Sequence, residues 1–150
     1  MSATSNIERR TLNSERKPVV SHPRVFDLEP RLLEFAAVII DVSEKLPATR
    51  AGSHIAGQLL RAGTSPYGNH GEAQTPESMD DFIHKMKICL KELRETRRWL
   101  RLIERKAWLD SDSQLLFLLR ECEELVRIFN ASIQTAERNK LNRRRQSGKL

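Results

Sequence analysis

Residues 78–107 read SMDDFIHKMKICLKELRETRRWLRLIERKA, and this stretch decides the fold class. Its apolar and small residues recur in alternating steps of four and three over nearly four heptads, the pattern of a helix that packs one face into a bundle. The members of this seam are Phe82, Met86, Cys89, Leu93, Thr96, Leu100, Ile103 and Ala107. Ser78 and Asp81 have the spacing of a capping box, which predicts that the helix begins directly after Ser78.

Two helices are predicted before this stretch. The first covers about residues 28–46, has a wide apolar face and is stopped by Pro47. The second covers about residues 49–73. Pro66 lies inside it, and because proline removes a helical hydrogen bond, we expect a kink or a break there.

A fourth helix is predicted after this stretch, with Ser111 and Gln114 as a second capping box. Its seam again steps by four and three, through Leu115, Leu119, Cys122, Val126, Phe129 and Ile133. Because the connections are short, neighbouring helices should be antiparallel. The sequence therefore predicts an all-α fold, an antiparallel up-and-down four-helix bundle over residues 25–137. Residues 1–24 should form a disordered N-terminal tail, and residues 138–150 a disordered basic C-terminal tail.

The composition argues against a membrane protein and places the excess charge at the two ends. Charged residues make up 31% of the sequence, and no stretch approaches the ~18 uncharged apolar residues that a spanning helix needs. No apolar signal segment follows Met1, so we expect a cytoplasmic protein. Residues 1–24 carry five bases and two acids, and residues 138–150 carry six bases and no acid, within a net charge of +6. Such tails either contact nucleic acid or serve as solubilising ends.

A second pattern on residues 78–107 is basic. Its six members also step by four and three: Lys87, Lys91, Arg94, Arg98, Arg101 and Arg105. At 100° per residue this stripe lies about 150° from the apolar seam and extends about 27 Å, which predicts a solvent-facing basic ridge. The ridge is either a contact surface for a phosphate backbone or an ordinary solvated face that Glu92, Glu95 and Glu104 partly offset. The C-terminal tail adds three further candidates for nucleic-acid binding: Arg143, Arg144 and Arg145.

Two other features lie beside these patterns. Trp99 and Leu102 fall outside the seam, where an exposed tryptophan either stacks on a base or fills a subunit interface, and we favour the interface. Arg61, Asn69 and Glu72 form a polar row on the second helix. This row is either a polar site or oligomer contact, or a set of interhelical hydrogen bonds that fix the helix register. We favour the hydrogen bonds.

The sequence offers no catalytic or metal-binding motif. Cys89 and Cys122 both occupy apolar seams and are expected to be reduced core residues. The four histidines match neither HExxH nor a Cys/His zinc spacing, and no phosphate-binding glycine loop or nucleophile motif occurs. We therefore expect a protein that acts by binding, with no metal, no cofactor, no small-molecule substrate and no enzymatic activity.

Two stretches of this sequence are similar to a known family. Residues 58–74 read QLLRAGTSPYGNHGEAQ, and residues 81–100 read DFIHKMKICLKELRETRRWL. Together they resemble the bacterial four-helix bundle proteins first named for reading frames in intervening sequences of 23S rRNA genes. The features that correspond are Arg61, Ser65, Asn69, Glu72, Asp81, Phe82, Lys85, Glu92, Glu95, Thr96, Trp99 and Leu100. The segment 66–70 departs from the family pattern, which puts the helix geometry there in doubt.

The resemblance implies an antiparallel four-helix bundle that assembles into a homo-oligomer, commonly a pentameric ring. It implies no established enzymatic activity. Relatives of the family include the basic accessory proteins of diversity-generating retroelements, which are associated with reverse transcriptase and nucleic acid. The expected partners are therefore further copies of the chain and RNA or DNA. The alternative function is that of a protein–protein adaptor that uses Trp99, Leu102 and the polar row.

Overall fold

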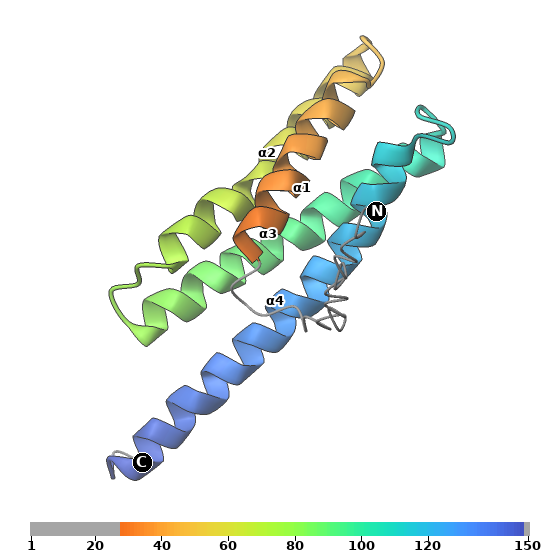
Figure 1. Cartoon of the computed structure of the whole chain (residues 1–150). Helices are drawn as coiled ribbons and strands as arrows, with labels where there is room; N and C mark the ends of the chain where they lie inside the picture. Colours follow the sequence, from red (N-terminus) through yellow and green to blue (C-terminus); the bar gives the residue numbers. More distant parts are fainter. Residues whose placement is uncertain (1–27, 149–150) are drawn as a thin grey trace, which may run out of the picture.

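The computed structural model describes residues 28–148, and these residues form four helices joined by short loops (Figure 1). The helices are α1 (Leu28–Glu44), α2 (Arg50–Ala73), α3 (Met79–Lys106) and α4 (Ser113–Gln146). Successive helices run in opposite directions, and each packs mainly against its neighbour in the sequence. This arrangement confirms the predicted all-α four-helix fold. The predicted N-terminal tail, residues 1–24, lies outside the described residues.

The core fills the space between the four seams and agrees closely with the sequence pattern. In α3 the seam from Met86 to Ile103 is buried, whereas Phe82 is only partly buried. The last predicted seam member, Ala107, is exposed and does not belong to the core. Ala107 is the C-cap of α3 with a left-handed φ of 51°, so its side chain has left the helical period.

The proline inside α2 does not break the helix. The sequence predicts a kink or a break at Pro66, but α2 continues as one helix from Arg50 to Ala73 and buries Pro66. The helix is held there by tight packing on both neighbours. On one side, the Gly63 backbone approaches the side chain of Ile39 closely. On the other, the carbonyl oxygen of Pro66 accepts a hydrogen bond from the Cys89 thiol, with the sulfur 3.6 Å away.

The helix starts are capped by short polar side chains. Ser78 begins α3 as predicted, because its Oγ accepts a hydrogen bond from the Asp81 amide at 3.0 Å. The reciprocal bond goes to the amide of Glu77, which donates to Asp81 Oδ2 at 3.1 Å. At α4 the predicted cap is wrong by one residue. Asp112, and not Ser111, accepts the hydrogen bond from the Leu115 amide at 2.9 Å.

The C-terminal segment corrects the prediction of a disordered tail that starts at residue 138. Helix α4 continues to Gln146 and extends beyond the other three helices (Figure 1). Arginine, lysine and glutamine favour helix, and the positive charge of Arg143, Arg144 and Arg145 suits a helix C-terminus. Two ion pairs attach this part of α4 to the start of α3, between Lys140 and Asp80 and between Lys87 and Glu137. The basic run is therefore presented on a helix.

Candidate nucleic-acid interface

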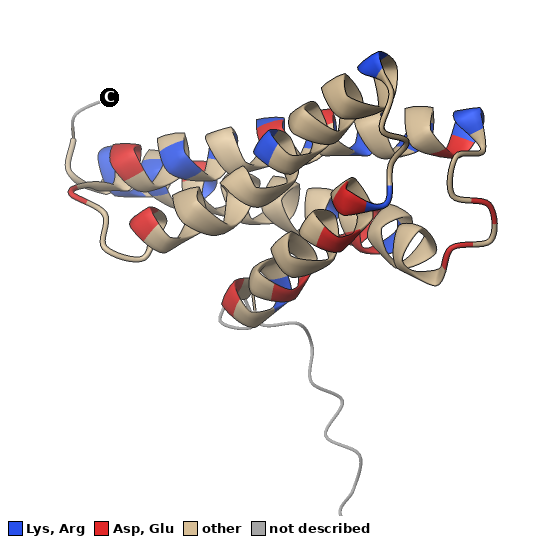
Figure 2. Cartoon of the chain, turned by 90° about the horizontal axis from the view of Figure 1, so that it is seen from above, with Lys and Arg blue, Asp and Glu red and all other residues tan. Residues whose placement is uncertain are grey.

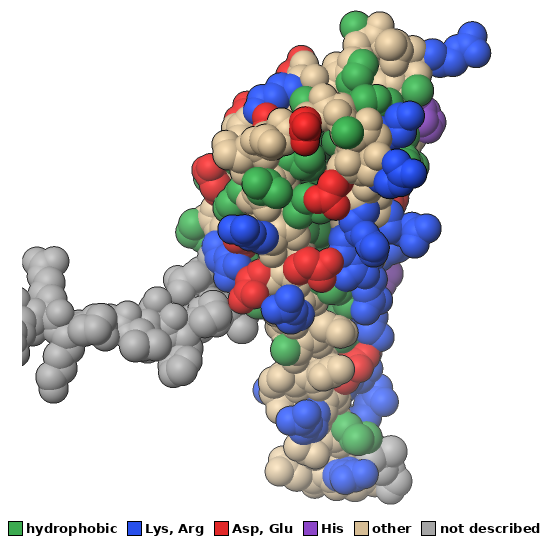
Figure 3. Space-filling view, turned by 90° about the vertical axis from the view of Figure 1, so that its right-hand side faces the viewer, with side chains coloured by type: hydrophobic (Ala, Val, Ile, Leu, Met, Phe, Trp, Pro, Cys, Tyr) green, Lys and Arg blue, Asp and Glu red, His purple; other side chains and the backbone are tan. Residues whose placement is uncertain are grey.

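The predicted basic ridge is present on the outer side of α3. All six of its side chains are exposed: Lys87, Lys91, Arg94, Arg98, Arg101 and Arg105. In Figure 3 a column of Lys and Arg side chains runs along one edge of the molecule. The ridge lies opposite the buried seam because the two patterns share one helical period with different phases. We call these six residues the α3 ridge.

Two carboxylates of α3 pair with an arginine of α2. The Arg61 guanidinium pairs with Glu92, at 3.3 Å from Nη1 to Oε2, and also with Glu95. Arg61 therefore neutralises these two acids, although Glu95 still lies beside Arg98 and Arg101, and Glu104 is exposed on α3. Within the ridge, Lys87 pairs with Glu137 at 2.7 Å. The other five ridge side chains form no ion pair with any carboxylate of residues 28–148.

The ridge continues into the end of α4 across the α3–α4 groove. One part of this groove is lined by Lys87, Lys91 and Arg94 together with polar residues of α4. The adjoining part contains Lys87 and Lys140, which pair with Glu137 and Asp80 of the same lining, and Arg144. The predicted tail residues Arg143, Arg144 and Arg145 are exposed on the helical extension. In Figure 2 Lys and Arg positions gather near the end marked C. The two basic features that the sequence treats separately are thus neighbours in space.

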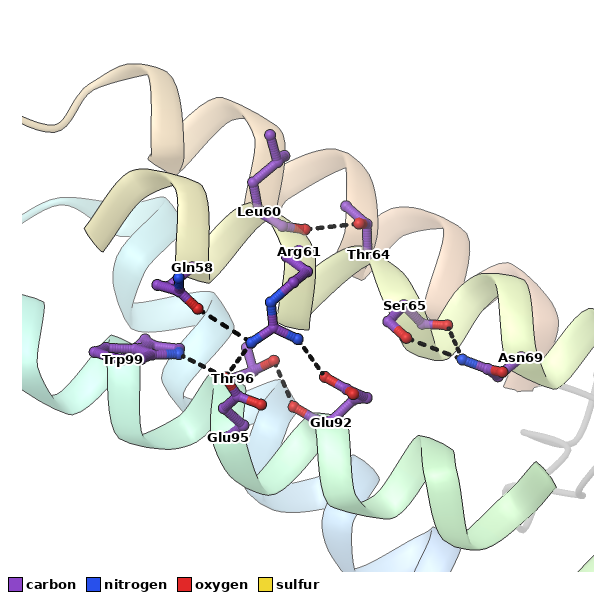
Figure 4. A network of polar contacts seen from close by, with 10 residues as sticks. All are labelled: Gln58, Leu60, Arg61, Thr64, Ser65, Asn69, Glu92, Glu95, Thr96 and Trp99. Carbon is purple, nitrogen blue, oxygen red and sulfur yellow. Dashed lines mark hydrogen bonds and ion pairs between the residues drawn. The ribbon is translucent and has the colours of Figure 1, made fainter. Parts of the chain in front are cut away.

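A polar network joins α2 to α3 beside the ridge (Figure 4). Arg61 donates to Gln58 Oε1 at 3.2 Å and to the carboxylates of Glu92 and Glu95. Glu95 Oε1, which accepts a hydrogen bond from Arg61 Nη2, also accepts one from Trp99 Nε1 at 3.3 Å. The indole of Trp99 is half-buried and packs against the core, although the sequence suggested an exposed tryptophan. We call Gln58, Arg61, Glu92, Glu95 and Trp99 the α2–α3 network.

The rest of the predicted polar row does not join this network. Asn69 donates to the hydroxyl and the carbonyl oxygen of Ser65, at 2.9 and 3.1 Å, within its own helix. Glu72 pairs with Lys85 of α3 at 3.6 Å. Arg61 and Glu72 therefore tie α2 to α3 at two separate places. Arg61 and Glu72 thus make contacts between helices, whereas the hydrogen bonds of Asn69 lie within α2.

Comparisons of sequence and structure with known proteins identify the family of this chain. The model of a family described as "23S rRNA-intervening sequence protein" matches residues 30–131. The chain belongs to this family. One similar solved structure is the crystal structure of a protein with unknown function from the S23 ribosomal protein family, from Bacteroides thetaiotaomicron VPI-5482. It is 31% identical with a TM-score of 0.65, and the match covers 71% of this chain and 97% of that one. No curated protein matches the chain significantly.

The family match separates the two basic features of this 23S rRNA-intervening sequence protein. The matched residues 30–131 contain the whole α3 ridge and the whole α2–α3 network. The basic end of α4, from Arg138 to Gln146, lies beyond the match. The ridge and the network therefore lie within the residues that match the family, whereas the helical extension lies outside them.

The buried titratable groups of this family member are structural. Burial raises the pKa of the Cys89 and Cys122 thiols to about 12, so both stay protonated at neutral pH. They donate weak hydrogen bonds to backbone carbonyl oxygens of α2 and α3, respectively. Both are free, as expected of core cysteines.

The sequence did not identify His70 as a core residue. This side chain is 2% exposed, and its ring lies edge-on to Phe129 with the centroids 6.1 Å apart. Its Nε2 pairs with the Gln74 amide at 3.1 Å, while Nδ1 is buried without a hydrogen-bond partner. Burial lowers the pKa of His70, and the nearby Glu29 opposes this effect. The available signal was its place four residues after Pro66 on the apolar side of α2.

Metal binding and membrane insertion find no support in residues 28–148. No group of three or more His, Cys, Asp or Glu side chains there is arranged to hold a metal ion. None of the four described helices is long and apolar enough to span a membrane. The α3 ridge can make ionic contacts with anions, and the aromatic and apolar side chains beside the ridge can stack on or pack against a ligand.

Proposed function

We propose that this chain is a non-enzymatic, homo-oligomeric RNA-binding protein of the cytoplasm that contacts the phosphate backbone through the α3 ridge. The observation that carries this proposal is the distribution of ion pairs on α3. Glu92 and Glu95 are paired with Arg61 of α2, while five exposed bases of the ridge form no ion pair with a carboxylate of residues 28–148. An unpaired basic stripe of this kind attracts phosphates and releases counterions when it binds them.

RNA is the nucleic acid to test first, with DNA as the comparison, because the family is named for reading frames inside 23S rRNA genes. The ridge lies within the residues that match the family. The helical end of α4 extends the same surface with Arg143, Arg144 and Arg145. Assembly of several copies, commonly a pentamer in the family that the sequence resembles, would repeat the ridge in one particle. Repetition raises the overall affinity without requiring strong individual contacts.

The direct test is to replace Arg94, Arg98 and Arg101 together by glutamine, which keeps helix propensity and removes three charges. A matched control replaces Arg50, Lys106 and Arg120 by glutamine, since these bases carry the same charge away from the ridge. Binding to a labelled structured RNA is then measured for the wild type and both variants. We expect the ridge variant to lose at least tenfold in affinity and the control variant to change much less. Equal affinity for all three proteins would remove the ridge from the proposal.

A protein–protein adaptor is the second candidate function, and apolar exposure favours it. Leu33 and Ile40 on α1 are 53% and 46% exposed, and Leu116 and Phe117 on α4 are exposed as well. Beside the ridge, Leu102 and part of Trp99 are also accessible. An adaptor would retain a specific protein from a lysate after nuclease treatment. Loss of every retained protein upon nuclease treatment would instead assign the partners to shared RNA.

A further inference from the structure

The α3 ridge and the α2–α3 network meet at one surface depression. Its described lining comes from one stretch of α3: Glu95, Arg98, Trp99, Arg101 and Leu102. Two of these residues are ridge arginines, and two are the largest apolar side chains on this part of the surface. The depression therefore combines fixed positive charge with a flat aromatic ring, which is the combination used to hold nucleotides outside a helix.

The network holds the indole of Trp99 in a defined orientation. Glu95 accepts hydrogen bonds on one oxygen from both Arg61 Nη2 and Trp99 Nε1 (Figure 4). Packing against the core restrains the ring further. An aromatic ring that is fixed before a ligand arrives loses little entropy upon binding. Because Arg61 neutralises Glu95, the carboxylate beside the indole does not repel an approaching phosphate as a free carboxylate would.

We propose that this depression binds an unpaired RNA base, which stacks on Trp99 and Leu102 while Arg98 and Arg101 contact the flanking phosphates. This inference rests on the proposed function and narrows its substrate class to RNA with single-stranded or looped nucleotides. Bases within a duplex are stacked and paired with each other and are not available to the indole. Stacking on an aromatic side chain tolerates any base, so we expect preference for unpaired structure and little preference for sequence.

The surroundings of Trp99 favour a nucleotide over a second copy of the chain. Charged residues are depleted at the centre of protein–protein interfaces. Here Arg98 and Arg101 are both exposed and flank the indole on the same helix. A two-fold contact between copies at this point would place the two ridges against each other, and like charges in such a contact cost affinity. A ring contact, which joins two different surfaces, would instead have to place carboxylates of the neighbouring copy opposite Arg98 and Arg101. A polyanion bound at the ridge would be attracted by these charges and would not meet this repulsion.

The test uses the full chain with Trp108→Phe, so that Trp99 is the only remaining tryptophan. Its fluorescence is recorded during titration with a short oligouridylate, with an RNA duplex of equal length, and with polyphosphate, which has charge and no bases. We expect strong quenching by the oligouridylate and little by the duplex or polyphosphate. Equal quenching by polyphosphate would overturn the proposal. A change in emission that follows protein concentration without RNA would also overturn it, by assigning Trp99 to a contact between copies.

A second variant separates this inference from the proposed function. Trp99→Leu keeps an apolar side chain against the core and removes the aromatic face. We expect it to lower affinity for the oligouridylate about tenfold and to leave duplex affinity nearly unchanged. If Trp99→Leu binds both RNAs like the wild type while the triple ridge variant binds neither, the stacking site is wrong and the ridge stands. If instead the ridge variant binds normally, the proposed function fails. The fluorescence titration decides the stacking site even if Trp99→Leu does not fold.

Discussion

Arg61 of α2 and Glu95 of α3 form an ion pair between helices, and the same Glu95 oxygen receives the indole N–H of Trp99. This relationship organises the surface of the molecule. Arg61 neutralises Glu92 and Glu95, the two acids of α3 that flank Trp99 and the ridge on the α2 side. The Arg61–Glu95 pair also fixes the one tryptophan that lies beside the ridge. Neutralisation of these acids and indole orientation thus depend on one residue of the neighbouring helix.

Replacing Arg61 by glutamine should lower RNA affinity more than it lowers stability. Its side chain is 51% exposed, so the ion pairs are well solvated and their loss should destabilise the fold by about 1 kcal/mol or less. The freed carboxylates of Glu92 and Glu95 would then repel phosphate beside the ridge, and we expect a several-fold loss of RNA affinity. Urea unfolding and RNA titration measure the two effects. Normal RNA affinity in this variant would show that the network does not support the ridge.

Gly63 is one of two glycines of α2, with Gly52, at which an added side chain would meet neighbouring atoms too closely. A Cβ at this position would lie 2.7 Å from the Cδ1 and Cγ1 atoms of the buried Ile39. Gly63→Ala should therefore destabilise the fold by about 1–3 kcal/mol through overpacking. Gly57→Ala is the matched control, because a Cβ there meets nothing within 4 Å. The control should be neutral or stabilising by up to about 1 kcal/mol in urea unfolding. Equal effects of the two substitutions would contradict the close α1–α2 contact.

His70 should make the stability fall as the pH drops below 6.5. Burial lowers its pKa in the folded state from 6.5, so the unfolded chain binds the proton first. The favourable contribution of neutral His70 is complete above pH 6.5 and is lost as the pH falls through the folded-state pKa. Lys140 and Lys45 lower the pKa values of Asp80 and Asp112 below the usual 3.8, so the stability that these carboxylates add is lost only at pH values below 3.8, outside this range. Chemical unfolding at several pH values measures the free energy of unfolding and tests the expected loss of stability below pH 6.5.

The control for this pH dependence is His70→Leu, which fills the same place in the core without a titratable group. The slope of stability against pH just below 6.5 should be smaller in this variant than in the wild type. His54→Leu changes an exposed histidine and should leave the slope unchanged. An identical slope in the wild type and in His70→Leu would assign the effect to another group.

The helical end of α4 should contribute to RNA binding as an ordered element. Leu141→Pro interrupts the helix at an exposed position before Arg143, so it should leave core stability nearly unchanged. We expect it to weaken RNA binding, because the bases Arg143, Arg144 and Arg145 lose their fixed position beside Lys87. Circular dichroism and RNA titration measure the two effects. Unchanged affinity would mean that these arginines act as a generic charged tail.

The sequence predicts those parts of the molecule that depend on one helix alone. The α3 seam and the ridge both follow from a period of 3.6 residues along a single segment, and the structure confirms their opposite orientation. The Arg61–Glu95 pair depends on how α2 is rotated relative to α3, and the sequence of neither helix alone specifies this rotation. The core position of His70 is hidden because one histidine interrupts an otherwise small and apolar stripe.

Two errors concern the boundaries of α4. The run of charged residues after Arg138 has the composition of a disordered tail, although arginine, lysine and glutamine are good helix formers. The Lys140–Asp80 pair that ties this run to α3 joins residues far apart in the chain. At the other end, Asp112 and not Ser111 caps α4, because Asp112 has the extended backbone of an N-cap and Ser111 has a left-handed φ of 56°.

The central claim is that the folded bundle binds RNA through its own surface, and the salt dependence of binding tests it most directly. A labelled structured RNA is titrated with the full chain and with residues 25–137, at about 50 and 200 mM salt, where phosphate contacts give a steep slope. We predict that both proteins bind and that both lose affinity steeply with salt. Binding by the full chain alone, with residues 25–137 inactive at both salt concentrations, would contradict the claim and reduce the bundle to a scaffold for its charged ends.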